Sequence, residues 1–341
     1  AAQTIEYVDE LIESANVHLL QGLGSPNGLA VYDKINAECI PHPFYLSGHP
    51  AWGDPEIHPW TTSRQMSYST EAMLWGTWIK VNLADQLPVS VAGLVMDNDF
   101  GLAYEMGFEA YAEQNPDVVE EYLPVRHDPA APTLTNEVTT IAAFDPDVFI
   151  SMTAGNPCLL AIQEVEASGL YDRLSAAFTP SVCKGIAAYL APAGMAADGY
   201  WIVGGGAKDT TDSGKMDEPF IAFARDLISD AGEDAGISLT GEGVFRGYAF
   251  TEAFRIADAL PGGMSRTNLM LALRNFKIYH PGLLDGLVTE LKGNADAYFV
   301  EGSEYSKFNA TDQTWEMIGD VVDANGGTPN CRWDKANGGC R

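Results

Sequence analysis

Apolar and polar positions along the chain follow two periods, one typical of buried strands and one of amphipathic helices. Residues 89–96 form a nearly unbroken apolar run, as expected of a parallel strand covered on both faces. Residues 69–83 place Leu74 and Trp78 at helical spacing, with Glu71 near the start. The other expected strands are residues 18–20, 40–46, 118–125, 147–152, 176–178, 199–203, 297–300 and 314–322, and the other expected helices are residues 102–114, 134–143, 157–168, 187–190, 218–231, 243–259 and 266–275. This alternation predicts a doubly wound α/β fold.

Composition limits the classes of protein and partner. The chain has 341 residues, of which 46% are apolar, so it is long enough for two domains with cores. Its 19 basic and 47 acidic residues give a net charge of −28, which repels nucleic acids and anionic membranes. No apolar run approaches the roughly 18 residues of a membrane helix. No signal peptide is visible, and a processed export signal would leave no trace.

A glycine-rich turn at residues 22–28 separates the short apolar run 18–20 from a helix-like segment. A strand that ends in a Gly/Ser turn and continues as a helix points free backbone N–H groups and a hydroxyl at whatever lies above the sheet edge. This pattern indicates a site for a small, anionic molecule. A plain tight turn is the alternative. A dinucleotide fingerprint is disfavoured because Pro26 lies among the glycines and no suitably placed acid ends the next strand.

The five cysteines bear on the compartment of the protein. Cys331 and Cys340 enclose a short loop with a Gly-Gly turn, which predicts a disulfide and favours an oxidising compartment. Two free thiols in a tail are the alternative, and a metal pair is disfavoured because no histidine lies nearby. Cys39, Cys158 and Cys183 stay unassigned, although Cys158 and Cys183 follow neighbouring predicted strands and could pair.

Short motifs in a fixed order carry a resemblance to a known family. They are the 22–28 loop, Asn-Asp-Phe-Gly at 98–101, Gly-Leu at 169–170 and Phe-Arg-Gly-Tyr-Ala at 245–249. Together with the order of elements, they resemble the type I extracytoplasmic solute-binding proteins, and within these the branched-chain amino acid (Leu/Ile/Val) group that feeds ABC importers. The resemblance covers essentially the whole chain, and its weight lies in the order of the motifs.

The resemblance implies two Rossmann-like lobes that close on a ligand by hinge motion, joined by crossings near Ser67, Gly206 and Tyr298. Three glycines at residues 204–206 agree with a hinge there. Family members begin with a strand, a helix and a strand that precede the helix at which Ala1 enters, so these 341 residues are expected to lack the sheet's first strand. Either the protein lacks it or, as we favour, the part that forms it lies outside these residues, because a fragment without it would expose unpaired backbone. The expected division is residues 1–67 and 207–297 in lobe 1, and residues 68–206 and 298–341 in lobe 2.

The resemblance also implies which residues face the ligand. Its carboxylate is expected at the hydroxyl of Ser25 and the backbone of the adjoining residues, and a second loop follows the strand 40–46. The full set of expected ligand-binding positions is Gly24, Ser25, Pro26, Leu46, Ser47, Gly48, His49, Tyr68, Phe100, Thr153, Ala154, Gly155, Ser181 and Arg246.

Departures from the family pattern predict the kind of ligand. Amino acid binders carry a Thr hydroxyl where this chain has Gly48, and the two acids that pair with the ligand's α-ammonium align with Tyr68 and Ser181. A buried ammonium without an opposite charge costs several kcal/mol, which argues against an α-amino acid. Aromatic walls at Tyr68 and Phe100 and a bidentate grip from Arg246 suit an apolar or aromatic organic acid. Core packing of the two rings and a structural ion pair of Arg246 are the alternatives.

Other site classes find little support. His42, His49 and His58, with Asp54 and Glu56, match no common metal-ligand spacing, and each His precedes a proline, as in a rigid loop. No nucleophile elbow, His-Glu-x-x-His motif or phosphate loop is present, so neither an enzyme nor a cofactor is expected. The resemblance therefore implies a solute-binding protein outside the cytoplasmic membrane, in the periplasm or as a lipoprotein, that serves ABC permease subunits. A branched-chain amino acid receptor and a ligand-sensing domain are the alternatives.

Overall fold

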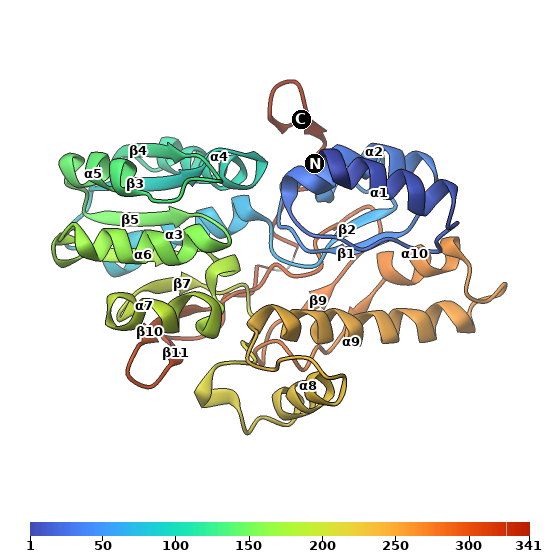
Figure 1. The fold of residues 1–341 in the computed structure, drawn as a ribbon. Helices are drawn as coiled ribbons and strands as arrows, with labels where there is room; N and C mark the ends of the chain where they lie inside the picture. Colours follow the sequence, from blue (N-terminus) through green and yellow to red (C-terminus); the bar gives the residue numbers. More distant parts are fainter. Residues whose placement is uncertain (325) are drawn as a thin grey trace.

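The computed structural model describes residues 1–324 and 326–341, which form two α/β lobes side by side (Figure 1). The chain passes between the lobes at residues 64–67, 204–206 and 301–304, the segments that separate paired elements of one lobe from those of the other. None of the described helices is long and apolar enough to cross a membrane.

Lobe 2 is built on a seven-stranded sheet with the order β11-β10-β7-β6-β5-β3-β4. Strands β3 to β7 run parallel, whereas β10 is antiparallel to both β7 and β11. A mixed sheet of this kind follows when a late hairpin joins the edge of a parallel core. The strands are β3 (Val89–Met96), β4 (Val119–His127), β5 (Val148–Met152), β6 (Ala176–Thr179), β7 (Trp201–Val203), β10 (Tyr305–Asn309) and β11 (Thr314–Met317).

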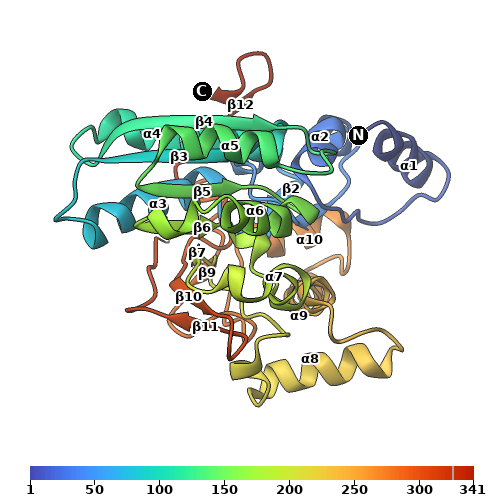
Figure 2. The ribbon, with the colours of Figure 1, turned by 60° about the vertical axis from the view of Figure 1, so that its left-hand side comes forward.

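Helices cover both faces of this sheet (Figure 2). On one face, Trp75, Trp78 and Phe108 from α3 and α4 pack against Val91 and Ile150 of the sheet. The other face carries a second buried cluster, to which α5 and α6 contribute. Burial on both faces explains why the central strands read as continuous apolar runs. The helices are α3 (Tyr68–Asn82), α4 (Asp99–Gln114), α5 (Thr135–Phe144), α6 (Asn156–Ala167) and the short α7 (Ala191–Ala193).

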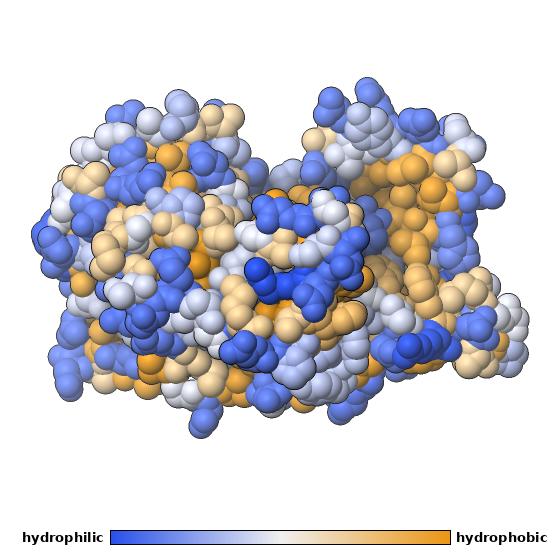
Figure 3. Space-filling view, turned by 60° about the horizontal axis from the view of Figure 1, so that its bottom comes forward, coloured by the Kyte–Doolittle hydropathy of each residue, from blue (hydrophilic) through white to orange (hydrophobic). Residues whose placement is uncertain are grey.

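Lobe 1 has less regular pairing around its own core. Its parallel strands β1 and β2 pair with each other, and Leu23 makes an isolated parallel bridge to Leu46. Phe44 packs in a cluster with Leu269 and Phe299. The space-filling view shows apolar atoms gathered in a hollow on the lobe 1 side, at the right (Figure 3). The elements are α1 (Ala2–Glu13), α2 (Ser25–Ala37), β1 (His42–Tyr45), β2 (Thr61–Ser63), α8 (Pro219–Asp230), α9 (Ser238–Ala259), α10 (Arg266–Arg274), β8 (Lys277–Ile278) and β9 (Thr289–Glu290).

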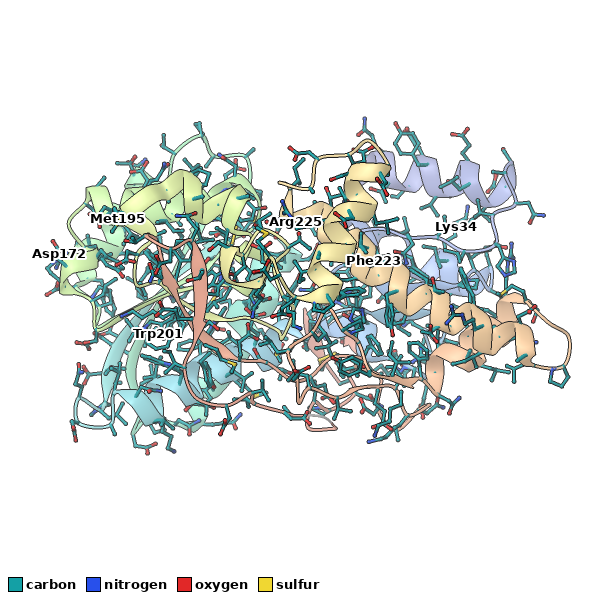
Figure 4. All side chains as sticks on the ribbon, turned by 90° about the horizontal axis from the view of Figure 1, so that it is seen from below. Lys34, Asp172, Met195, Trp201, Phe223 and Arg225 are labelled. Atoms are coloured by element: carbon teal, nitrogen blue, oxygen red, sulfur yellow. A yellow bond between two sulfur atoms is a disulfide. The ribbon has the colours of Figure 1, made fainter. Side chains whose placement is uncertain are left out.

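Helix α8 is tied to the chain that follows the second crossing. Figure 4 shows Arg225 and Phe223 on this helix. Arg225 Nη1 donates to the carbonyls of Thr210 at 2.7 Å and Ala235 at 2.8 Å, which joins the segments before and after the helix. The ring of Phe223 is 54% exposed, so α8 leaves part of its apolar face uncovered.

The C-terminal residues fold back as a small hairpin, β12 (Trp333–Asp334) and β13 (Gly339–Cys340), closed by the predicted Cys331–Cys340 disulfide. Trp333 packs against the buried cluster that contains Tyr32 and Trp52 of lobe 1. The ammonium of Lys335 lies 4.4 Å from the ring centroid of Tyr32, in cation–π geometry. The hairpin thus covers α2 of lobe 1, although the sequence assigned all of residues 298–341 to lobe 2. A second disulfide joins Cys158 to Cys183, and Cys39 is a free, exposed thiol.

Loss of the hairpin disulfide is expected to lower the free energy of unfolding. A bridge over 9 residues of sequence separation restricts the unfolded chain, and a loop of this length contributes about 2.6 kcal/mol. We expect the Cys331→Ser/Cys340→Ser variant to unfold at correspondingly lower urea concentration. The Cys39→Ser variant is the control and is expected to match the wild type. Equal stability of the double variant and the wild type would contradict the prediction.

Several element boundaries differ from the sequence prediction. The strand predicted at residues 297–300 is wrong, since this segment makes only the isolated bridge between Val300 and Thr289. Its apolar side chains are instead buried in the lobe 1 core. Strands β2 and β10 were not predicted, because neither shows a clear alternating pattern. The strand predicted at residues 314–322 is confined to β11.

Candidate ligand-binding site

Two serine hydroxyls meet in lobe 1 where the chain enters α2. Ser25 is the first residue of α2, and its Oγ lies 2.9 Å from the Oγ of Ser47 in the loop after β1. Gly24 precedes the helix with φ of 88°, a conformation that favours glycine. Pro26 fits the first turn because its missing N–H would have no helical partner there. The predicted Ser25 and Ser47 loops are thus brought together at a helix N-terminus, which attracts anions.

Backbone hydrogen bonds hold the two loops in register. The N–H of Gly24 donates to the carbonyl of Leu46 at 3.1 Å, and the phenol of Tyr45 donates to the carbonyl of Gly24 at 2.8 Å. The hydroxyl of Ser63 donates to the carbonyl of Ser47 at 2.8 Å. The position of the serine pair is therefore set by the ends of the lobe 1 strands.

Tyr68 of lobe 2 and Gly48 of lobe 1 interlock across the junction of the lobes. The N–H of Tyr68 donates to the carbonyl of Gly48 at 2.7 Å. A Cβ atom at residue 48 would lie 2.2 Å from the carbonyl oxygen of Met66 and 2.7 Å from the Tyr68 ring. The glycine and the tyrosine, noted separately in the sequence, are one structural feature, because the ring occupies the space that a side chain at residue 48 would need.

The phenol of Tyr68 faces the serine pair. Burial raises the pKa of Tyr68, while the Gly48 backbone and the hydroxyls of Ser47 and Ser25 act in the opposite direction. Ser25 and Ser47 are fully buried and Tyr68 is 2% exposed, so these hydroxyls are covered in this structure. Entry of a ligand requires Tyr68 to move away from the serine pair, as hinge motion between the lobes allows.

An aromatic stack extends from Tyr68 into lobe 2. Its ring stacks on Tyr104 with centroids 4.4 Å apart, and Phe100 meets it edge-on at 5.0 Å. The ring of Tyr104 in turn stacks on Trp75 at 5.1 Å. Phe100 is placed in the first turn of α4, where the side chain of Asn98 accepts its N–H at 3.0 Å. The predicted aromatic wall is therefore also part of the lobe 2 core.

A buried carboxyl group, which the sequence analysis did not assign to the site, lies one turn beyond Tyr68. Glu71 is fully buried and accepts hydrogen bonds from the N–H of Ser181 at 2.7 Å, the hydroxyl of Ser181 at 2.6 Å and the phenol of Tyr104 at 2.8 Å. Burial, aided by the charge of Glu304, raises the pKa of Glu71 to about 7, against the effect of these donors. A carboxyl group therefore does lie beside Ser181, but it is the side chain of Glu71 in α3 and not a residue at position 181.

Glu71 is expected to make stability depend on pH. Its folded pKa of about 7 exceeds the ordinary value of 4.5, so between these values the folded state keeps a proton that the unfolded chain has lost. The stabilisation is complete below the lower value and is lost as pH rises through about 7. Between pH 5 and pH 8 we expect the free energy of unfolding of the wild type to fall by about 2 kcal/mol more than that of Glu71→Gln. Urea unfolding across this range, with exposed Glu38→Gln as the control, measures the difference, and equal slopes for wild type and Glu71→Gln would contradict it.

Thr153, Ala154 and Gly155 lie where β5 leads into α6. The hydroxyl of Thr153 is buried and lies 2.7 Å from that of Ser151, and its carbonyl lies 3.2 Å from Cys183 Sγ. Ala154 packs against the cluster that contains the aromatic stack, and Gly155 is exposed at the helix start. The Thr153 hydroxyl is therefore hydrogen-bonded within lobe 2.

His49 and Arg246 have partners within lobe 1. His49 Nδ1 accepts the N–H of Ala51 at 3.1 Å, and burial lowers the pKa of His49 to about 3, so the ring is neutral. Arg246 Nη1 donates to Gln21 Oε1 at 3.1 Å, and burial lowers its pKa against the effect of Glu242. A ligand role for Arg246 stays a prediction.

Of the remaining histidines considered for metal binding, His58 has acidic partners, whereas the Nδ1 of His42 is buried with no hydrogen-bond partner among the described residues. His42 is buried with its ring 4.5 Å from that of Tyr45, and His58 lies 2.8 Å from Asp33 and 3.4 Å from Asp54. Across residues 1–324 and 326–341, no group of three His, Cys, Asp or Glu side chains is arranged to hold a metal ion.

Comparison with known families decides the class of protein. Residues 1–301 match the family model described as periplasmic binding protein. The chain belongs to this family. Its members are binding proteins, in agreement with the expectation that this chain is not an enzyme. No curated protein matches the chain in a sequence comparison.

Solved structures share the fold at low sequence identity. A branched-chain amino acid ABC transporter protein from Thermus thermophilus with bound valine is 15% identical, with a TM-score of 0.80 over 94% of this chain and 82% of that one. A solute-binding protein of Rhodopseudomonas palustris HaA2 in complex with p-hydroxybenzoic acid is 15% identical, with a TM-score of 0.75 over 95% and 83%. A fatty acid ABC transporter substrate-binding protein from Thermomonospora curvata is 14% identical, with a TM-score of 0.74 over 94% and 78%. The periplasmic binding protein fold is therefore shown.

Proposed function

We propose that this periplasmic binding protein is the extracytoplasmic solute-binding component of an ABC importer and that it clamps a small apolar or aromatic organic acid between its lobes. The observation that carries the proposal is the meeting of Ser25, Ser47 and Tyr68 at the N-terminus of α2. Three hydroxyls beside free helix N–H groups suit a carboxylate. The ligand would displace the phenol of Tyr68 from the serine pair when the lobes open and reclose.

The aromatic stack supports an apolar body for this ligand. Phe100 and Tyr104 present ring faces and edges beside Tyr68, a lining on which an aromatic or aliphatic group packs well. The fold neighbour that carries p-hydroxybenzoic acid agrees with such a ligand class.

The hydrogen bonds that Glu71 already accepts argue against a ligand with an α-ammonium group. Its two oxygens already accept three hydrogen bonds from Ser181 and Tyr104, and its pKa near 7 leaves much of it neutral at physiological pH. An ammonium placed there would have to break these bonds before gaining a charge partner.

The two disulfides support a location outside the cytoplasm, since structural disulfides persist in oxidising compartments. Permease subunits are the proposed protein partners.

Thermal unfolding against a ligand panel tests the proposal. The panel contains benzoate, 4-hydroxybenzoate, short aliphatic acids, larger cyclic carboxylates and leucine, isoleucine and valine. A ligand at about 100 times its dissociation constant adds about 2.7 kcal/mol to the free energy of unfolding. We expect stabilisation by the non-amino carboxylates only. Stabilisation by the amino acids alone would overturn the proposed ligand class.

A branched-chain amino acid receptor is the second candidate. The valine-bound fold neighbour favours it, and Glu71 is the carboxyl that would have to receive the ammonium. In that case Glu71→Gln would abolish leucine binding, whereas under the organic acid proposal the same variant keeps its affinity for benzoate-type ligands. A ligand-sensing domain would bind the same compounds but would not support their uptake with a permease.

A further inference from the structure

The C-terminal hairpin is part of a segment that contacts both lobes. We call residues 326–341 the C-terminal strap. The chain approaches the strap from lobe 2, where Val322 packs against the buried cluster of that lobe. The strap then reaches lobe 1, where its hairpin covers α2 (Figure 1). It therefore spans the junction of the lobes in addition to the three crossings, and it lies beyond residue 301, where the match to the family model ends.

The strap is fixed to lobe 1 through its hairpin, which the Cys331–Cys340 disulfide closes. The N–H of Cys331 donates to the carbonyl of Gly53 at 2.8 Å. The ring of Trp333 meets that of His49 edge-on, with centroids 4.4 Å apart. Because His49 belongs to the same loop as Ser47, this end of the strap also supports a loop of the inter-lobe site.

The strap meets lobe 2 at a pair of hydroxyl groups. The Oγ1 of Thr328 lies 2.8 Å from the Oγ1 of Thr70, which is in the first turn of α3. The backbone N–H groups of Gly326 and Thr328 donate to the carboxylate of Glu301 in the third crossing, the second of them at 2.7 Å. Glu301 is buried, so this part of the strap is ordered by the crossing itself and holds the Thr328 hydroxyl toward α3.

The two attachments are close together along the chain. Thr328 and Cys331 are three residues apart, and Pro329 between them has a fixed φ angle. An extended chain spans at most about 3.6 Å per residue, so this linker has little slack. When the lobes rotate apart, Thr70 moves relative to Gly53. The hydrogen bond between the two hydroxyls is lost once their oxygens are more than about 3.5 Å apart, so the rotation releases it.

We propose that the C-terminal strap is a latch on the hinge, which moves with lobe 1 and is fastened to lobe 2 by the Thr70–Thr328 pair while the serine pair is covered. Release of the latch accompanies the opening that admits a ligand. The role of the latch in uptake rests on the proposed inter-lobe function, whereas the latch itself is tested without a ligand.

Hydrogen exchange of the Tyr68 amide reports the opening of the lobes. This N–H donates to the carbonyl of Gly48 across the junction, so it exchanges with water when the lobes separate. The amides of β3 are the internal reference, because β3 lies inside the lobe 2 sheet and its amides exchange when that lobe unfolds. All variants are made in the full chain with Cys39→Ser, which removes the exposed free thiol.

Thr328→Val removes the latch hydroxyl and keeps the shape of the side chain. We expect the Tyr68 amide to exchange about 2- to 10-fold faster in this variant, the factor that corresponds to one hydrogen bond, with β3 unchanged. Thr139→Val is the matched control, because Thr139 is exposed on α5 and its hydroxyl donates to the carbonyl of Thr135 in the same helix at 2.6 Å. Its Tyr68 amide is expected to exchange as in the wild type.

An engineered disulfide tests the opposite direction. Because the hydroxyl oxygens of Thr70 and Thr328 are 2.8 Å apart, cysteines at both positions are close enough to be joined. In oxidised Thr70→Cys/Thr328→Cys we expect the Tyr68 amide to exchange at least tenfold more slowly than in the single variant Thr328→Cys. The tightest acid of the ligand panel is expected to associate at least tenfold more slowly with the cross-linked protein.

Three results would overturn the latch. They are unchanged exchange of the Tyr68 amide in Thr328→Val and in the cross-linked variant, an equal change in the amides of β3, and failure of the two cysteines to join on oxidation. If Tyr68 exchange responds as expected but no compound of the panel stabilises the protein, the latch is supported and the proposed ligand class is rejected.

Discussion

Replacing Gly48 with alanine is expected to lower the free energy of unfolding by about 3 kcal/mol or more. The added Cβ would lie 2.2 Å from the carbonyl oxygen of Met66, a backbone atom that cannot move without displacing the residues that cross between the lobes. It would also lie 2.7 Å from the ring of Tyr68, which is buried between Gly48 and Tyr104. Urea unfolding of Gly48→Ala and wild type measures the loss.

Gly243→Ala is the matched control for this prediction. Gly243 lies within α9, and a Cβ there would meet no atom within 4 Å. Because alanine is the better helix former, this variant is expected to gain up to about 1 kcal/mol. Opposite signs for the two glycine variants would confirm the interlock of Gly48 with Tyr68, whereas a Gly48→Ala variant as stable as the wild type would refute it.

Replacing Ser25 with alanine is expected to weaken binding of the organic acid between the lobes by about 10- to 100-fold. The reason is that a hydroxyl that hydrogen-bonds to a charged group contributes about 1.5–3 kcal/mol. The Oγ of Ser25 lies 2.9 Å from that of Ser47, so its loss also leaves the second hydroxyl without its neighbour. Isothermal titration calorimetry with the tightest acid of the panel measures the change.

Ser265→Ala provides the corresponding control. Ser265 caps α10 and accepts the N–H of Asn268 at 3.1 Å, so its loss is expected to cost about 1 kcal/mol of stability. Its affinity for the acid is expected to equal that of the wild type, since its hydroxyl serves only the helix cap. If Ser25→Ala binds the acid as tightly as Ser265→Ala, the assignment of the carboxylate to the serine pair is incorrect.

The fold was largely accessible from the sequence because its central strands are buried on both faces. The apolar run at residues 89–96 corresponds to β3, whose bounds are Val89–Met96. Strand β10 was missed because its five residues, Tyr305–Asn309, show no clear alternation of apolar and polar side chains. Residues 297–300 misled the prediction because burial in an irregular segment produces the same apolar composition as strand pairing.

Parts of the candidate site could also be predicted from the sequence, since loops that follow parallel strands meet at one edge of a sheet. The approach of Ser25 to Ser47 is present in the structure, but the strand predicted at residues 18–20 is not formed, and an isolated parallel bridge between Leu23 and Leu46 aligns the two loops instead. Glu71 was not assigned to the site, because an acid near a helix start usually serves the helix dipole. Its spacing of three residues from Tyr68 was the one available signal, since such residues share a face of the helix.

The sequence by itself determined the alternation of strands and helices and the disulfide of the C-terminal loop, because local periodicity and short-range spacing encode them, and the order of its motifs carried the resemblance to the family. Only the tertiary structure decided that Gly48 and Tyr68 form one feature, that Glu71 is held by Ser181, and that the C-terminal strap contacts both lobes. These contacts join residues from different elements, and Glu71 and Ser181 are separated by 110 positions. Steric exclusion, hydrogen-bond saturation and desolvation depend on distances that the order of residues does not specify.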